Sequence, residues 1–118
     1  QLALHFSLDK DTLSPSDVYQ ASRLGIHFAQ LEDDILDQAY DELSTSGSKI
    51  YGYAYFTQDD PRGYRTHFKP EDDWILLLQL DTDDNLMWGD CGVANWFIKR
   101  QDLINKDFSK VFFTWDCC

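Results

Sequence analysis

The stretch WILLLQLD, residues Trp74–Asp81, decides the fold of this chain of 118 residues. Before the final Asp81 its one polar residue is Gln79, so the apolar run is nearly continuous. A run of this length and composition is typical of a β-strand that is covered on both faces. Turn-forming residues follow it at 82–85. We therefore expect a central strand here, with the rest of a sheet built around it.

Further strand patterns lie on both sides of this stretch. The additional strands that we expect are 50–57, one beginning at 86–88, 93–98 and 111–115. Turns rich in Gly, Asp and Pro separate them, and a short helix is expected from about Arg100 to Lys106 with Asp102 in its first turns. Strands joined by short turns make a largely antiparallel sheet with two or three flanking helices. The predicted fold class is α+β.

Residues 1–48 form the helical N-terminal portion of the same domain in this prediction, and residues 49–118 the sheet-rich portion. Ser14 is the expected N-cap of a first helix, with Pro15 at its first position and Gly25 at its end. Apolar residues recur at helical spacing over 31–43, which predicts an amphipathic helix with acidic residues on its outer face. Gly47 is expected to stop that helix with a left-handed conformation, and residues 3–8 are expected to form a short strand.

The chain is acidic, with 21 Asp and Glu against 10 Lys and Arg, a net charge of −11 and an isoelectric point near 4.3. This charge repels phosphate backbones and anionic membrane surfaces. No apolar run reaches the ~18 residues that a membrane span requires. The composition therefore predicts neither a nucleic-acid partner nor a membrane partner. It suits a soluble protein, which is the favoured interpretation, or a protein whose partner is basic.

Three cysteines are present, at 91, 117 and 118. An odd number with two adjacent residues does not fit a secreted disulfide framework. Adjacent cysteines also lie too close together for an unstrained bond. We expect reduced thiols and a cytoplasmic protein. Zinc is not expected, because the cysteines and His67 show no closely spaced pairs, and we predict no metal and no cofactor.

Four sequence blocks in order resemble the YwqG-like family of bacterial proteins. The blocks are GYAYFTQDDPR (52–62), LLLQLD (76–81), MWGDCGVANWFI (87–98), and DFSKV with WDC (107–111 and 115–117). The resemblance covers about residues 49–118. It implies an α+β fold and a domain of unknown function, with no catalytic residues to carry over. Similar domains have been suggested to lie near bacterial toxin systems, which implies toxin immunity as one version of a binding role.

Members of that family typically have a further N-terminal part rich in Gly, Pro and Trp. No such part is seen here, and the sequence begins at Gln1 rather than Met. We therefore expect that the chain is a fragment of a longer protein.

The turn Trp88–Gly92 is the most distinctive candidate site. Two glycines around an acid and a thiol permit tight backbone geometry and the close approach of a ligand. In the functional interpretation Asp90 is an acid, base or metal ligand, and Trp88 and Trp96 form a stacking wall. In the structural interpretation the segment is a tight hairpin whose aspartate caps its own backbone. The structural interpretation is favoured.

A second group of candidates surrounds a basic, aromatic segment, residues 62–69. Arg62 and Arg65 offer bidentate hydrogen bonds to an anion, and His67 and Asp59 complete the candidate ligand-binding set. The structural alternative is a surface loop whose cations pair with Asp59, Asp60 and Asp72. Carboxylates also recur at strand ends, where hard cations such as Mg²⁺ or Ca²⁺ bind when several converge. Residues 81–85 open like a calcium loop, but Leu86 stands where that motif requires Gly. His5 and His27, in apolar neighbourhoods, are expected to be packed in the core.

The sequence does not establish an activity. The leading hypothesis is a non-catalytic, acidic protein-binding module, because the chain is strongly charged and shows no recognised catalytic motif. The alternative is a small-ligand or divalent-metal-binding protein or enzyme that uses the strand-end carboxylates. A third alternative is that this portion only completes the fold of a missing N-terminal part.

Overall fold

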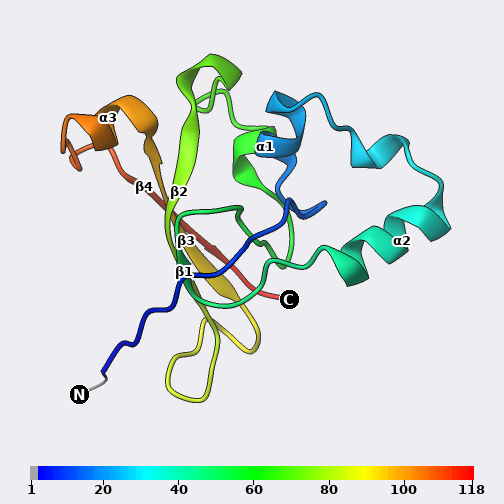
Figure 1. Ribbon diagram of the computed structural model, residues 1–118, viewed down its shortest axis with the longest axis horizontal. Helices are drawn as coiled ribbons and strands as arrows, with labels where there is room; N and C mark the ends of the chain where they lie inside the picture. Colours follow the sequence, from blue (N-terminus) through cyan, green and yellow to red (C-terminus); the bar gives the residue numbers. More distant parts are fainter. Residues whose placement is uncertain (1–2) are drawn as a thin grey trace.

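A computed structural model describes residues 3–118 as an antiparallel sheet with helical segments around it (Figure 1). The helical elements are α1 (Val18–Arg23), η1 (Phe28–Gln30), α2 (Asp33–Glu42), η2 (Pro61–Gly63), η3 (Pro70–Asp72) and α3 (Arg100–Ile104). The strands are β1 (Lys49–Ile50), β2 (Trp74–Asp81), β3 (Val93–Lys99) and β4 (Phe112–Asp116). The strands follow each other in the order β1-β2-β3-β4, and every neighbouring pair is antiparallel. The α+β prediction is confirmed.

The sheet has two different faces, which we call the covered face and the aromatic face. A bulge between Leu76 and Leu78 shifts the register of β2 against β3. Because side chains alternate along a strand, the bulge places Gln79 on the same face as Leu76. This covered face carries Phe97 of β3 and Phe112 of β4. The aromatic face carries the residues that alternate with these along the strands, among them Trp96 of β3 and Phe113 of β4.

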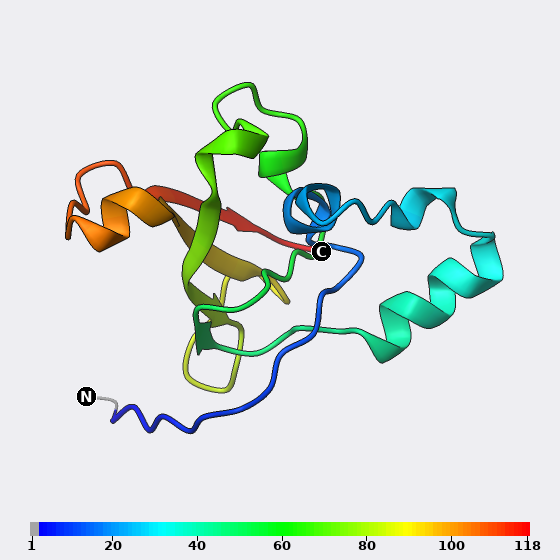
Figure 2. The same ribbon diagram turned by 45° about the horizontal axis from the view of Figure 1, so that its top comes forward.

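The hydrophobic core lies between the covered face and the segments that cross it. Its buried members are Tyr19, Ala54, Phe56, Phe68, Trp74, Leu76 and Phe97, with Phe112 packed against them. Figure 2 shows α1 and the segment that follows β1 on the same side of the sheet. The Phe68 ring lies edge-on to Trp74 and to Phe112, with centroids 4.9 and 4.8 Å away. Aromatic side chains therefore supply most of the volume of the core.

Three of the predicted strands differ from the structure. Residues 3–8 are exposed and form no strand, and residues 86–88 lie in an irregular loop. The strand predicted at 50–57 is reduced to β1, because Tyr51 and Gly52 adopt positive φ angles of 66° and 92° and turn the chain out of the sheet. The remaining residues of this segment instead donate backbone hydrogen bonds to side chains, as Ala54 N–H does to Asp17 and Tyr55 N–H does to Gln79.

The helices differ from prediction mainly at their ends. Asp17, not Ser14, caps α1, and its side chain accepts a hydrogen bond from Gln20 N–H. Gly25, the predicted end of this helix, follows its C-cap Leu24 and has a positive φ of 74°. The amphipathic helix is confirmed as α2, which stands away from the sheet in both ribbon views (Figures 1 and 2). Gly47 has a positive φ of 99° but lies in the following loop, since α2 already ends at Glu42.

Candidate functional site

Four aromatic side chains form the candidate site, on the aromatic face of the sheet. They are Trp88, Trp96, Phe113 and Trp115. Trp96 and Phe113 are direct partners in the β3–β4 register, and their ring centroids are 4.8 Å apart. Trp88 comes from the loop before β3 and lies 6.2 Å from both of these rings and 6.4 Å from Trp115. Phe113 is 45% exposed and Trp115 51%, so this apolar group faces solvent.

The loop that carries Trp88, residues 82–92, is held by side-chain hydrogen bonds at its base. Thr82 Oγ1 donates to Gly92 O over 2.7 Å and accepts from Trp88 N–H. Asp83 accepts from the N–H groups of Asn85 and Leu86, so it closes a turn within the loop. The segment that resembles the start of a calcium loop therefore uses its Asp83 carboxylate for backbone hydrogen bonds.

Of the predicted residues in this region, the structure brings Trp88 and Trp96 together and leaves Asp90 exposed beside them. Gly89 adopts a positive φ of 65°, as a tight turn requires. Met87, also in this loop, is 65% exposed and extends the apolar surface. The exposed acids of the same loop are Asp83, Asp84 and Asp90. The candidate residues thus form an exposed aromatic group, and the loop that contributes Trp88 also carries exposed acids.

Arg62, predicted as a ligand-binding residue, is buried inside the fold. Its guanidinium forms ion pairs with Asp17 at 2.6 Å and with Asp60 at 3.0 Å, and all three side chains are excluded from solvent. It also lies over the ring of Phe97, 4.2 Å from the centroid, in cation–π geometry. Burial raises the pKa of Asp17, and the neighbouring Asp60 carboxylate raises it further against the opposing effect of Arg62.

The other residues of the second candidate group are exposed, whereas Arg62 is buried. Asp59 is exposed, and so is Arg65, whose guanidinium lies 5.6 Å from the centroid of Phe112. His67 is exposed and packs with its ring 5.3 Å from that of Trp74 and 5.8 Å from that of Phe112. The structure thus brings Arg65 and His67 to one aromatic edge of the core, at Phe112. His5 and His27, predicted to be packed, are both exposed.

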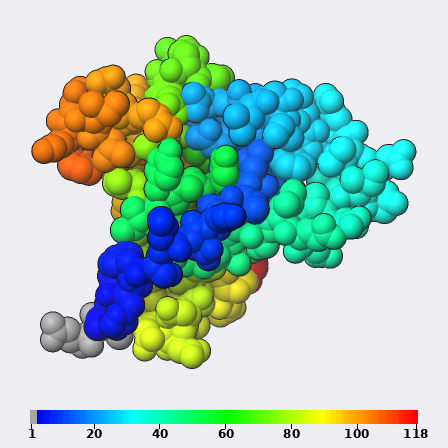
Figure 3. All heavy atoms as spheres, in the orientation of Figure 1, coloured from blue at the N-terminus to red at the C-terminus, as the bar shows by residue number. Residues whose placement is uncertain are grey.

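An open groove of about 1050 Å³ lies beside the N-terminal segment. It is lined by residues 5–11, by residues around β1 and by Arg23 and Arg100 among others, and it contains none of the seven predicted site residues. In Figure 3 the N-terminal segment crosses this face of the molecule, with α2 projecting on one side. A salt bridge from Lys49 to Asp11, 2.9 Å long, ties the N-terminal segment to β1.

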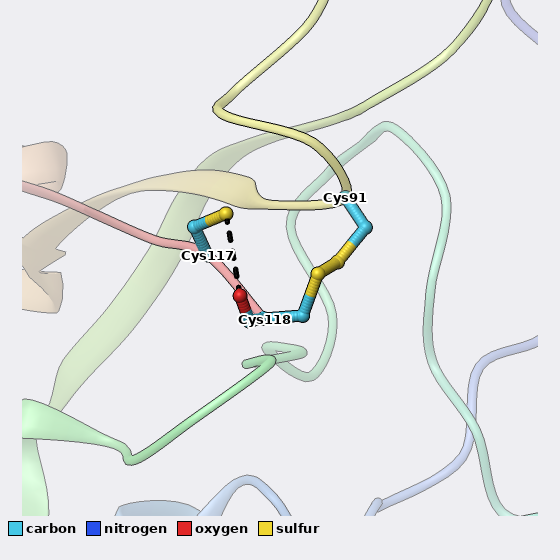
Figure 4. A group of neighbouring side chains, drawn as sticks. All are labelled: Cys91, Cys117 and Cys118. Carbon is cyan, nitrogen blue, oxygen red and sulfur yellow. Dashed lines mark hydrogen bonds between the residues drawn. A yellow bond between two sulfur atoms is a disulfide. The ribbon is translucent and has the colours of Figure 1, made fainter.

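The three cysteines converge at the end of the sheet, which the sequence analysis did not predict. Figure 4 shows Cys91 joined to Cys118 by a disulfide, with the thiol of Cys117 beside them. The expectation of reduced thiols is therefore corrected. In residues 3–118 this is the one group of three His, Cys, Asp or Glu side chains whose ligand atoms all lie within 4.8 Å of each other. The strand-end carboxylates do not gather in this way in the described part of the chain.

The protein is an α+β domain. Its antiparallel sheet is covered by core segments on one face and carries exposed aromatic residues on the other. The chain belongs to the family described as a domain of unknown function, DUF1963, whose model matches residues 1–117. The YwqG-like identity stays a prediction. No curated protein matches the chain significantly. Among residues 3–118, no helix has the length and apolar character needed to cross a membrane.

Proposed function

We propose that this domain is a non-catalytic protein-binding module that docks a basic partner on its aromatic face. The observation that carries the proposal is the exposure of Phe113 and Trp115, 45% and 51%, next to Trp88 and Trp96. Tryptophan, tyrosine and similar anchors dominate the energetics of protein interfaces when they are grouped on an accessible surface. Contiguous exposed apolar groups bordered by polar residues are typical of such interfaces.

The position of β4 supports the same proposal. This strand is an edge of the sheet, and in the described residues its backbone pairs with β3 alone. An open edge beside aromatic side chains suits an extended peptide segment, which adds as a further strand while its side chains contact the neighbouring pockets. The exposed acids of the loop 82–92 and the net charge of −11 favour a segment that carries Lys or Arg. Immunity toward a basic toxin is one form that this function would take.

Two residues that the sequence suggested for ligand chemistry have structural partners instead. The guanidinium of Arg62 forms two buried ion pairs, and Asp81 accepts hydrogen bonds from the N–H groups of Gly47 and Thr82. Groups with such partners hold segments of the fold together and do not face a substrate. The binding role is therefore favoured over the small-ligand or divalent-metal alternative.

The test compares two surface variants in a pull-down from the native host. The double variant Phe113→Ser/Trp115→Ser removes the aromatic anchors, and Tyr40→Ser on α2 removes a side chain of similar exposure, 48%, elsewhere. The expected result is that the wild type and Tyr40→Ser retain the same protein at low salt, and that the double variant loses it. High salt should weaken the retention, because salt screens the attraction between exposed charges. Equal retention by the double variant, with its fold confirmed by circular dichroism, would refute the proposal.

A further inference from the structure

The β3–β4 register explains why Cys91 and Cys118 meet. Val93 of β3 pairs with Asp116 of β4 in antiparallel register. Continuing this register by two residues, backwards from Val93 and forwards from Asp116, places Cys91 opposite Cys118. Their Cα atoms are 5.9 Å apart, within the usual range for a disulfide. The bond therefore follows from the sheet topology.

Cys117 brings a third sulfur to this bond. Because side chains alternate along an extended chain, Cys117 continues the side of β4 that carries Trp115. Its Sγ lies over Gly89, where an added Cβ would be only 2.5 Å from the sulfur. The absence of a side chain at Gly89 thus creates the space that the Cys117 thiol occupies. All three sulfurs lie within 4.8 Å of one another, and Cys117 is free.

We propose that Cys91, Cys117 and Cys118 form a thiol–disulfide exchange site. The Cys117 thiolate attacks Sγ of Cys91, the Cys91–Cys118 bond breaks, a Cys91–Cys117 bond forms, and Cys118 leaves as a thiolate. One S–S bond replaces another, so the step needs no oxidant or reductant. Attack on Cys118 is disfavoured, because neighbouring Cα atoms are about 3.8 Å apart, shorter than disulfides normally span. The exchange therefore has one direction of attack and one leaving group.

The substrate class follows from which sulfur is released. Cys118 is exposed, so its thiolate is able to attack an external disulfide, form a mixed disulfide and release one thiolate of that reagent. Asp90 and Asp116 lie next to the site in the sequence, and the whole chain is strongly acidic. A cationic disulfide should therefore react faster than an anionic one. This inference is independent of the proposed binding function and uses other residues.

The first test maps the disulfide after the protein is held at mildly alkaline pH, where thiols ionise, and its free thiols are then alkylated. Trypsin releases Cys91 in the peptide 66–99, since Lys69 precedes Pro70, and both other cysteines in the peptide that begins at Val111. Fragmentation of the second peptide shows which cysteine was alkylated. The expected result is alkylation at Cys117 in one population and at Cys118 in another.

Three variants make the result decisive. Cys117→Ser retains only the Cys91–Cys118 bond and should show no alkylated thiol. Cys118→Ser has two thiols and no disulfide to exchange, so it is treated with one equivalent of the disulfide cystamine. The cystamine is reduced to two molecules of cysteamine, and the Cys91–Cys117 bond should form. Gly89→Ala should lower the share of alkylated Cys118, because its Cβ displaces the Cys117 sulfur. Wild-type protein alkylated at Cys117 alone, or Cys118→Ser that keeps two free thiols after treatment with cystamine, would overturn the proposal.

The second test adds cystamine, a cationic disulfide, to the folded wild-type protein. The expected adduct is one cysteamine group on Cys118, formed faster than the adduct with the anionic oxidised glutathione. Added salt should narrow that difference in rate, because it screens the acidic surface. An adduct found on Cys117 alone would show a simple exposed thiol without exchange and would contradict the proposal.

Discussion

The guanidinium of Arg62 donates a hydrogen bond of 2.6 Å to the carboxylate of Asp17, and both side chains are fully buried. The same Asp17 carboxylate also accepts from Gln20 N–H at the start of α1 and from Ala54 N–H in the segment after β1. Asp60 completes the group by pairing with Arg62 and accepting from Tyr19 N–H. One ionic group therefore joins α1, η2 and the segment that crosses the covered face.

Replacing Arg62 with Met should destabilise the fold strongly. The thioether retains most of the side-chain volume, but two buried carboxylates lose their counter-charge. Breaking a buried ion pair in this way costs about 3–5 kcal/mol. Chemical denaturation measures the effect, and Arg65→Met is the matched control, because Arg65 is exposed and its loss should cost less than about 0.5 kcal/mol. Equal stability of the two variants would show that the buried pairs contribute little.

Asp17 gives the fold a pH dependence of defined sign. Its pKa in the folded protein is raised above the ordinary value of 3.8, chiefly by burial. As pH rises from that value, the unfolded chain loses the Asp17 proton first, so folding becomes less favourable until the folded-state pKa is passed. The stability that the bound proton contributes is fully present below pH 3.8. It is lost as the pH rises through the folded-state pKa of Asp17.

Asp17→Asn removes this titration and tests its sign. The free energy of unfolding of the wild type, minus that of the variant, should fall as pH rises from the acid limit toward neutrality. Denaturant titrations at a series of pH values measure this difference. A difference that instead grows with rising pH would mean that Arg62 lowers the pKa of Asp17 more than burial raises it.

Arg62 shows where sequence reasoning reaches its limit. The local sequence Asp60-Pro61-Arg62 correctly indicated a turn, and Asp60 side-chain Oδ1 does accept from Arg62 N–H. The partner that buries Arg62 is Asp17, however, 45 residues earlier in the chain. A helix-start residue and a basic loop residue look like surface features until tertiary packing brings them together. The structural interpretation of the basic segment foresaw pairing with Asp60 but not with Asp17.

In the sheet and at the cysteines, too, local features were predictable from the sequence and long-range contacts were not. Runs of apolar residues predicted β2 and β3 almost to the residue, because a strand pattern is local. The bulge at Leu77 and the resulting position of Gln79 depend on pairing with β3, and so does the meeting of Cys91 with Cys118. Knowing that Val93 pairs with Asp116 would have predicted the disulfide, but register is not encoded by spacing alone. Trp88 and Trp96, close in sequence across a turn, were correctly placed together.

Gln79 should be essential to the loop packing on the covered face. It is fully buried, its Oε1 accepts from Tyr55 N–H, and its Nε2 donates to the carbonyls of Thr45 and Gly47. Gln79→Met keeps the shape and leaves these backbone groups without partners, each at a cost of about 1–3 kcal/mol. Thermal or chemical unfolding should show a loss of several kcal/mol.

The control for this prediction is Gln101→Met, because Gln101 is exposed on α3. Its stability should stay within about 0.5 kcal/mol of the wild type. Hydrogen exchange adds a local measurement, since the Tyr55 amide should lose protection in Gln79→Met alone. A Gln79→Met protein with unchanged stability would show that water replaces the amide at this position.

Gly52 and Gly47 offer a comparison between backbone strain alone and strain combined with a lost contact. Both adopt positive φ, 92° and 99°, so alanine at either position costs on the order of 1–2 kcal/mol in backbone strain. A Cβ at Gly47 meets open space, whereas a Cβ at Gly52 would collide with the Asp11 carboxylate. That carboxylate accepts from Lys49 Nζ and from Tyr53 N–H, both at 2.9 Å.

Gly52→Ala should therefore destabilise the protein more than Gly47→Ala, by about 1 kcal/mol for the displaced hydrogen bonds. The two variants should also differ locally. Because Asp11 ties the N-terminal segment to β1, limited proteolysis should cut residues 3–13 faster in Gly52→Ala than in Gly47→Ala. Equal destabilisation and equal cleavage would mean that Asp11 moves aside at no cost, and that the N-terminal segment is held by other contacts.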